Sequence, residues 1–223
     1  MLNTFELPKW FEAPLYIRNE LIHLWNKSYY ELYEESFVKD ESTLVKGELE
    51  FDILKLINLC EDKDTKRSFK TFMYFNWILC LSVKPNIDSY LKDSLGYESY
   101  EFMLNDLKSW SCGYPLSDNF SDYILSSKDM GVVAEAVLVY KNMQKIPKCE
   151  GIIDLISDSI DSCLQGRGIA HGTVDKRAIF NWLLIHVFPS AYCHRLPDFI
   201  YTINFDIENW NYFKFEELDS TTK

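Results

Sequence analysis

Apolar side chains recur at three- and four-residue spacings along most of this chain, which is the pattern of one buried face of an α-helix. Residues 14–37 carry such a stripe opposite a face rich in glutamate, and residues 47–62 repeat the arrangement. Shorter segments with the same spacing lie at 86–95, 98–111 and 118–127. The pattern therefore predicts amphipathic helices over most of the sequence.

Three further segments are apolar nearly all the way round a helix: 69–83, 130–140 and 178–188. A helix without a polar face is buried on most sides. We therefore predict that these three form the central layer and that the amphipathic helices pack around them. Pro85 and Pro189 are predicted to end two of them, because proline cannot continue the backbone hydrogen-bond ladder.

Two asparagines interrupt these apolar segments, each between a phenylalanine and a tryptophan: Asn76 and Asn181. A buried side-chain amide needs hydrogen-bond partners. The two residues are therefore predicted to tie neighbouring loops to the core.

The turns and the tail complete the predicted architecture. Glycine and proline mark a loop at 112–118, and the chain holds only 8 glycines and 7 prolines, which favours long helices with short connections. The tail 199–218 is rich in aromatic residues and alternates apolar with polar side chains at 203–208, so a short strand or extended arm is favoured over a helix. We predict an all-α fold, a single domain over 1–223: a multi-helix bundle with buried central helices and an aromatic-rich C-terminal arm.

Charge narrows the classes of partner. The net charge is −11 and the isoelectric point is about 4.8, which disfavours nucleic acid and anionic membranes as ligands. Acidity serves solubility in many proteins, but if it serves binding here, the partner is basic. The longest apolar run, 71–83, is shorter than the ~20 residues that cross a bilayer, and the first residues do not resemble a secretion signal. We therefore expect a soluble, cytoplasmic protein.

The cysteines show neither metal spacing nor a CxxC pair, and we interpret them as reduced thiols. They are Cys60, Cys80, Cys112, Cys149, Cys163 and Cys193.

A glycine-rich joint at 165–177 holds the most concentrated polar chemistry. Gly166 or Gly168 is predicted to cap the helix before it, and Thr173 or Asp175 to cap a helix that begins near residue 176. The joint does not match a phosphate-binding loop. It carries a possible polar cluster of Arg167, His171, Lys176 and Arg177. This cluster is either a set of ion pairs between helices or a binding site, and the sequence leaves both open.

Catalytic and metal-binding motifs are not recognisable. No GxSxG elbow accompanies the histidines, and no HExxH or HxH pair suggests a metal ligand set. His186 lies in an apolar segment and is predicted to be a core histidine. We therefore expect no enzyme activity, no cofactor and no metal.

Acidic strips are the stronger indication of function. Asp154, Asp158 and Asp161 are spaced to stack on one side of a helix, opposite a stripe of isoleucines. A second strip contains Glu31, Glu34 and Glu35. Like charges at this spacing weaken a helix slightly, so the strips are either ordinary solvated faces or surfaces that bind a basic partner. We predict the latter for these six residues.

A segment of the C-terminal third resembles a known family. Residues 175–184, DKRAIFNWLL, followed by 187–191, VFPSA, are similar to a pattern in helical immunity proteins of bacterial polymorphic-toxin and contact-dependent growth inhibition systems. The resemblance covers roughly residues 150–195. It implies an all-helical cytoplasmic protein that binds and neutralises one cognate toxin, without catalytic residues.

Charge, missing catalytic motifs and resemblance favour one functional interpretation. We predict an immunity protein that binds a basic toxin, a nuclease domain, in a 1:1 complex through an acidic surface. The alternative is a helical scaffold or adaptor that binds a protein without inhibiting it. An enzyme that uses the 166–177 cluster is a further alternative.

Overall fold

The structure is a computed structural model, and it describes most of the 223-residue chain. The described residues are 5–34, 54–60, 65–125, 131–148, 151–171, 173–201 and 215–217. Among them, only the backbone is described at 27–34, 65, 131–132, 164–177 and 215–217.

Helices make up most of the described chain, as the hydrophobic pattern predicts. In order, the elements are α1 (Leu15–Glu34), α3 (Thr65–Leu91), α4 (Glu98–Ser111), the 3₁₀ turn η2 (Phe120–Asp122), α5 (Gly131–Lys145), the 3₁₀ turn η3 (Ile146–Lys148), α6 (Ile152–His171), α7 (Thr173–Trp182), the π-helical turn η4 (Leu183–Val187), α8 (Phe188–Tyr192), β1 (Phe199–Tyr201) and β2 (Phe215–Glu217). Residues 54–58 form a further short helix. The fold is all-α, and α4 has the bounds predicted for it.

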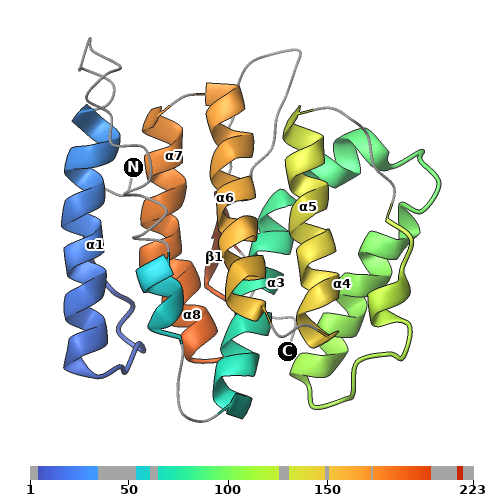
Figure 1. The fold of residues 1–223 in the computed structure, drawn as a ribbon, viewed down its shortest axis with the longest axis horizontal. Helices are drawn as coiled ribbons and strands as arrows, with labels where there is room; N and C mark the ends of the chain where they lie inside the picture. Colours follow the sequence, from blue (N-terminus) through green and yellow to red (C-terminus); the bar gives the residue numbers. More distant parts are fainter. Residues whose placement is uncertain are drawn as a thin grey trace.

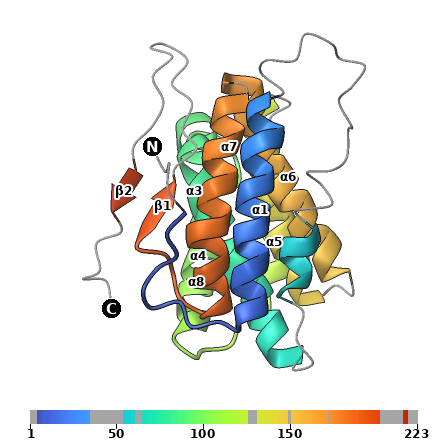
Figure 2. The same ribbon diagram turned by 90° about the vertical axis from the view of Figure 1, so that its left-hand side faces the viewer.

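The helices form a bundle with neighbouring axes running in nearly the same or opposite directions (Figures 1 and 2). Helices α1, α7, α6 and α5 lie side by side, each packed against the next. Helix α3 lies behind them and packs against α5, α6 and α8, while α4 packs on α3. The helices that are distant in sequence thus share one core.

The predicted central layer is confirmed for two of its three segments. Every residue of 71–80 in α3 and of 179–185 in α7 and η4 is buried. Helix α5 differs: Val137 and Val139 are buried, but Leu138 between them is exposed. This helix therefore has an outer face that its apolar composition does not reveal.

The two prolines do not end helices at the predicted positions. Helix α3 continues through Pro85 to Leu91, because the fully buried Ile87 and Leu91 hold its last turns against the core. Their burial offsets the ~3 kcal/mol that an interior proline costs. Pro189 directly follows the π-helical turn η4 and Phe188 in one continuous helical run, so it does not end a helix either. The chain accordingly stays helical to Tyr192.

The buried asparagines also differ from the prediction. The side-chain amide of Asn76 donates to the carbonyl of Val139 at 3.2 Å, so it joins two central helices rather than a loop to the core. The thiol of Cys80, one turn away, reaches the same carbonyl at 3.9 Å. Asn181 is buried, and its side-chain oxygen has no partner among the described residues.

Several shorter predictions are confirmed only in part. Residues 112–118 contain no helix, as expected for a loop. Of 86–95, only the part up to Leu91 is helical, and of the described part of 118–127 only η2 is. Most of the predicted 47–62 helix lies outside the described residues.

The C-terminal arm contains strands where it is described. β1 pairs with β2 antiparallel, with Ile200 opposite Glu216. The indole of Trp182 donates to the carbonyl of Phe199 at 3.2 Å and so fixes β1 to the helical core. Residues 203–208, which carry the predicted alternation, lie outside the described part.

Candidate functional site

The acidic row of α6 lies on the outer side of this helix. Asp154 and Asp158, one turn apart, are exposed, whereas Ile156 and Ile160 are buried. Asp154 also stands in the first turn, where the helix dipole favours a negative charge. The predicted separation of acidic and apolar faces is therefore confirmed for these residues.

Asp161 does not fully share this environment. It is half-buried and has an interaction with other residues, so its carboxylate differs from the two that face solvent. The third predicted aspartate thus contributes less to an open acidic surface.

The second acidic strip is only partly described. Glu31 and Glu34 belong to α1, but their side chains lie outside what the structure describes, and Glu35 lies outside the described residues altogether. The prediction that they form a binding surface remains a prediction.

The glycine-rich joint is shorter than predicted. Helix α6 continues through Gly166 and Gly168 to His171, and α7 begins at Thr173, so neither glycine caps a helix and Thr173 and Asp175 lie inside one. Interior glycines cost a helix about 1 kcal/mol each, which packing of α6 between α5 and α7 can offset.

The four residues of the predicted polar cluster flank this joint. Arg167 and His171 are one turn apart near the end of α6, and Lys176 and Arg177 lie near the start of α7. Their side chains are outside what the structure describes. Both interpretations of the cluster, ion pairs between helices and a binding site, therefore stay predictions.

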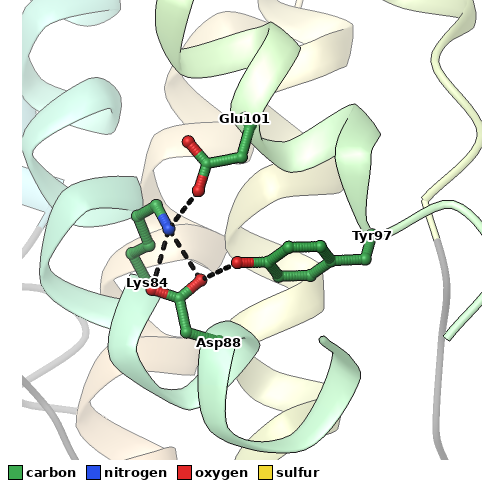
Figure 3. Close-up of polar contacts among 4 residues, drawn as sticks. All are labelled: Lys84, Asp88, Tyr97 and Glu101. Atoms are coloured by element: carbon green, nitrogen blue, oxygen red, sulfur yellow. Dashed lines mark hydrogen bonds and ion pairs between the residues drawn. The ribbon is translucent and has the colours of Figure 1, made fainter. Parts of the chain in front are cut away.

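A polar network that the sequence analysis missed joins α3 to α4 (Figure 3). The ammonium of Lys84 lies 2.6 Å from a carboxylate oxygen of Asp88 and 2.5 Å from one of Glu101. The hydroxyl of Tyr97 donates to Asp88 at 2.7 Å. We call these four residues the Lys84 network. The spacing of Lys84 and Asp88 is visible in the sequence as a helix pair, but their neighbours from the next helix are not.

The pKa values of Lys84 and Tyr97 are both raised in the Lys84 network. Burial disfavours the charged form of Lys84, but the two carboxylates outweigh burial and raise its pKa. The hydrogen bond to Asp88, together with burial, raises the pKa of Tyr97. At neutral pH the network therefore contains one cation between two carboxylates and one neutral phenol. This arrangement is suited to fastening two helices.

A second missed feature is the end of α8, where His194 has a positive φ of 53°. Its backbone N–H donates to the carbonyl of Ala191, and the N–H of the next residue donates to that of Ser190, which is the left-handed helix ending that glycine usually occupies. The imidazole Nε2 lies 3.2 Å from the hydroxyl of Thr71, and the ring stacks on Tyr74. Burial lowers the pKa of His194, so the ring is neutral and joins α8 to α3.

The described cysteines are free thiols with little nucleophilic character where they are buried. Burial raises the pKa of Cys60 and Cys80, and raises that of Cys163 to about 12. Cys149 lies outside the described residues. His186, predicted to be a core residue, is only partly buried, and burial lowers its pKa despite the nearby Asp198.

A cavity of about 510 Å³ opens between the C-terminal part of α5 with η3 and the segment 121–125. We call it the lysine cavity. Its lining includes Tyr123, Leu125, Lys141, Gln144, Lys145 and Lys148. The sequence analysis missed it because its two walls come from segments that only the fold brings together.

Over the described part of the chain, no three His, Cys, Asp or Glu side chains are grouped to hold a metal ion. Over the same part, no helix has the length and apolar character needed to cross a bilayer. Comparisons with family models, curated proteins and solved structures gave no significant match. Function must therefore be argued from the residues themselves.

Proposed function

We propose that this protein binds and neutralises a basic partner protein, a toxin domain that cleaves nucleic acid, through the outer face of α6. The observation that carries the proposal is the exposure of Asp154 and Asp158 on a helix whose inner face is buried. Carboxylates in a row can occupy the positions that phosphates take on a basic nuclease. Complementary charge also raises the rate of encounter by orders of magnitude.

The packing of α6 supports the same proposal. Helices α5 and α7 flank α6, and α3 lies behind it, so its backbone is fixed before any partner binds (Figure 1). A surface held rigid in advance loses less conformational entropy on binding. The resemblance of 150–195 to immunity proteins includes this helix and adds the class of partner.

The test uses the open reading frame immediately upstream of the gene. We expect that its product arrests growth when expressed alone, and that co-expression with this protein restores growth and yields a 1:1 complex. The double variant Asp154→Asn/Asp158→Asn should weaken the complex about tenfold or more, and added salt should weaken the wild-type complex. Calorimetry and growth measure the two effects.

A matched control separates the α6 face from net charge. Asp93→Asn/Asp118→Asn removes the same charge from two other exposed positions, and it should change affinity less than about twofold. Equal losses in both double variants would show that total charge, not α6, determines binding. A harmless neighbour that does not bind would remove the toxin proposal.

One observation favours a second function, that of an adaptor. Helix α1 lies at the edge of the bundle, and its outer face exposes Leu15 by 72% and Tyr16 by 67%, with Ile22 further along. Exposed apolar side chains of this size indicate a protein contact when they gather on one face. An adaptor that used α1 would bind with little dependence on salt, and Tyr16→Ser with Ile22→Ser would abolish that binding.

A further inference from the structure

The lysine cavity is lined by positively charged side chains, although the chain as a whole is acidic. The sequence has 34 acidic and 23 basic residues, yet three lysines line one wall of this cavity. Lys141, Lys145 and Lys148 stand at positions i, i+4 and i+7 of α5 and η3, so they project from nearly the same side. Like charges at this spacing repel one another.

Most of this positive charge lacks a carboxylate partner. Lys148 lies 3.3 Å from Asp122, and both side chains are largely exposed. Within the described part of the chain, Lys141 and Lys145 have no ion pair. The helix dipole favours Lys145 in the last turn of α5, but Lys141 lies a full turn earlier, where this effect has faded. Two of the lysines that line the cavity therefore have no carboxylate partner among the described residues.

The opposite wall includes Tyr123, whose side chain and backbone are held in place by neighbouring residues. The hydroxyl of Tyr123 donates to Asp106 at 2.9 Å, and its carbonyl accepts a hydrogen bond from the side chain of Gln144 at 2.8 Å. The ring also packs against Phe102 and Phe120. Tyr123 lines the cavity together with Leu125, and most of the exposed lining is apolar.

We propose that the lysine cavity binds a nucleoside phosphate, with the phosphate on Lys141 and Lys145 and the base against Tyr123. Two uncompensated ammonium groups balance the charge of a phosphate dianion, and lysine binds phosphate as a point charge without demanding one geometry. The cavity volume lies within the ~300–1,000 Å³ of small-molecule sites. This site is separate from the outer face of α6 and does not depend on the function proposed above.

Calorimetric titration of the full chain with the four nucleoside monophosphates tests the proposal. Adenosine and inorganic phosphate serve as probes of the two halves of the ligand. At least one monophosphate should bind more tightly than either half, and its affinity should fall as salt rises. Lys141→Gln/Lys145→Gln keeps the helix propensity and should weaken binding about tenfold or more.

The control removes two lysines that lie elsewhere. Lys92→Gln/Lys108→Gln makes the same change of net charge at two exposed positions, and it should leave affinity unchanged within about twofold. Thermal unfolding verifies that both double variants fold. The proposal is overturned if no monophosphate binds at millimolar concentration, if both double variants lose affinity equally, or if adenosine binds as tightly as its monophosphate.

Discussion

The Lys84 network and the lysine cavity both contain lysine and tyrosine, but they differ in how the charges are matched. In the network the single ammonium touches two carboxylates, and the tyrosine hydroxyl completes the set. At the cavity, among the described residues, Lys148 lies near the exposed carboxylate of Asp122, whereas Lys141 and Lys145 have no carboxylate partner. Matched charges stabilise a contact between helices, whereas unmatched charges remain available to a ligand. The comparison therefore separates a structural cluster from a candidate site.

We expect the largest difference between the Lys84 network and the lysine cavity in what each contributes to the free energy of unfolding. Lys84→Met leaves Asp88 and Glu101 without their cation, and because Lys84 is only 21% exposed, the loss falls between that of a buried and a surface ion pair. We expect the free energy of unfolding to drop by about 1–2 kcal/mol. Lys141→Met should change it by less than about 0.5 kcal/mol.

Urea denaturation of both variants measures these values. The two substitutions delete the same group and preserve helix propensity, so their difference reports the local partners alone. Equal losses would contradict the distinction between the two regions.

A smaller effect is expected from alkaline pH. The pKa of Lys84 is raised above its ordinary value of 10.5, so the stability that the network contributes is complete below that pH and disappears as pH rises through the folded-state pKa. The raised pKa of Tyr97 acts in the same direction. The stability difference between wild type and Lys84→Met should therefore shrink above pH 10.5, as followed by denaturation at a series of pH values. A difference that stays constant would show that packing, not charge, is responsible.

The smallest effect is expected beside the lysine cavity. Asp122→Asn removes the carboxylate near Lys148, and since the side chains of this pair are 67% and 61% exposed, stability should be nearly unchanged. The freed lysine should strengthen binding of a nucleoside phosphate two- to threefold, by roughly 0.5 kcal/mol. Titration of this variant beside the wild type measures the change. Weaker binding would indicate that Asp122 itself contacts the ligand.

The hydrophobic pattern predicts much of this fold because helix burial has a local period. It predicts the bounds of α4 and the all-round burial of 71–80 and 179–185. It fails at Pro85, where burial of residues beyond the proline decides the outcome, and at Gly166, where neighbouring helices hold the backbone helical. In both places tertiary packing overrides local preference.

The candidate sites also differ in whether a local sequence pattern or tertiary packing creates them. Asp154 and Asp158 lie on one helix, so their spacing alone predicts a shared face. Glu101 reaches Lys84 from another helix, and Tyr123 and Lys141 line one cavity from different segments. Contacts between elements have no signature in a single sequence, and for this reason both features escaped prediction.

The π-helical turn η4 allows one continuous helical segment to pack against different helices before and after the turn. The backbone N–H of Phe188 donates to Leu183, five residues earlier, so the turn holds one residue more than an α-helical turn. Each residue rotates a helix by about 100°, and the extra one shifts the phase of α8 relative to α7 by that angle. Helix α7 accordingly packs on α1 and α6, whereas α8, on the same run, packs on α3. Deleting one residue within 183–187 would hardly change the composition, yet it would rotate Phe188 and Ala191 out of the core.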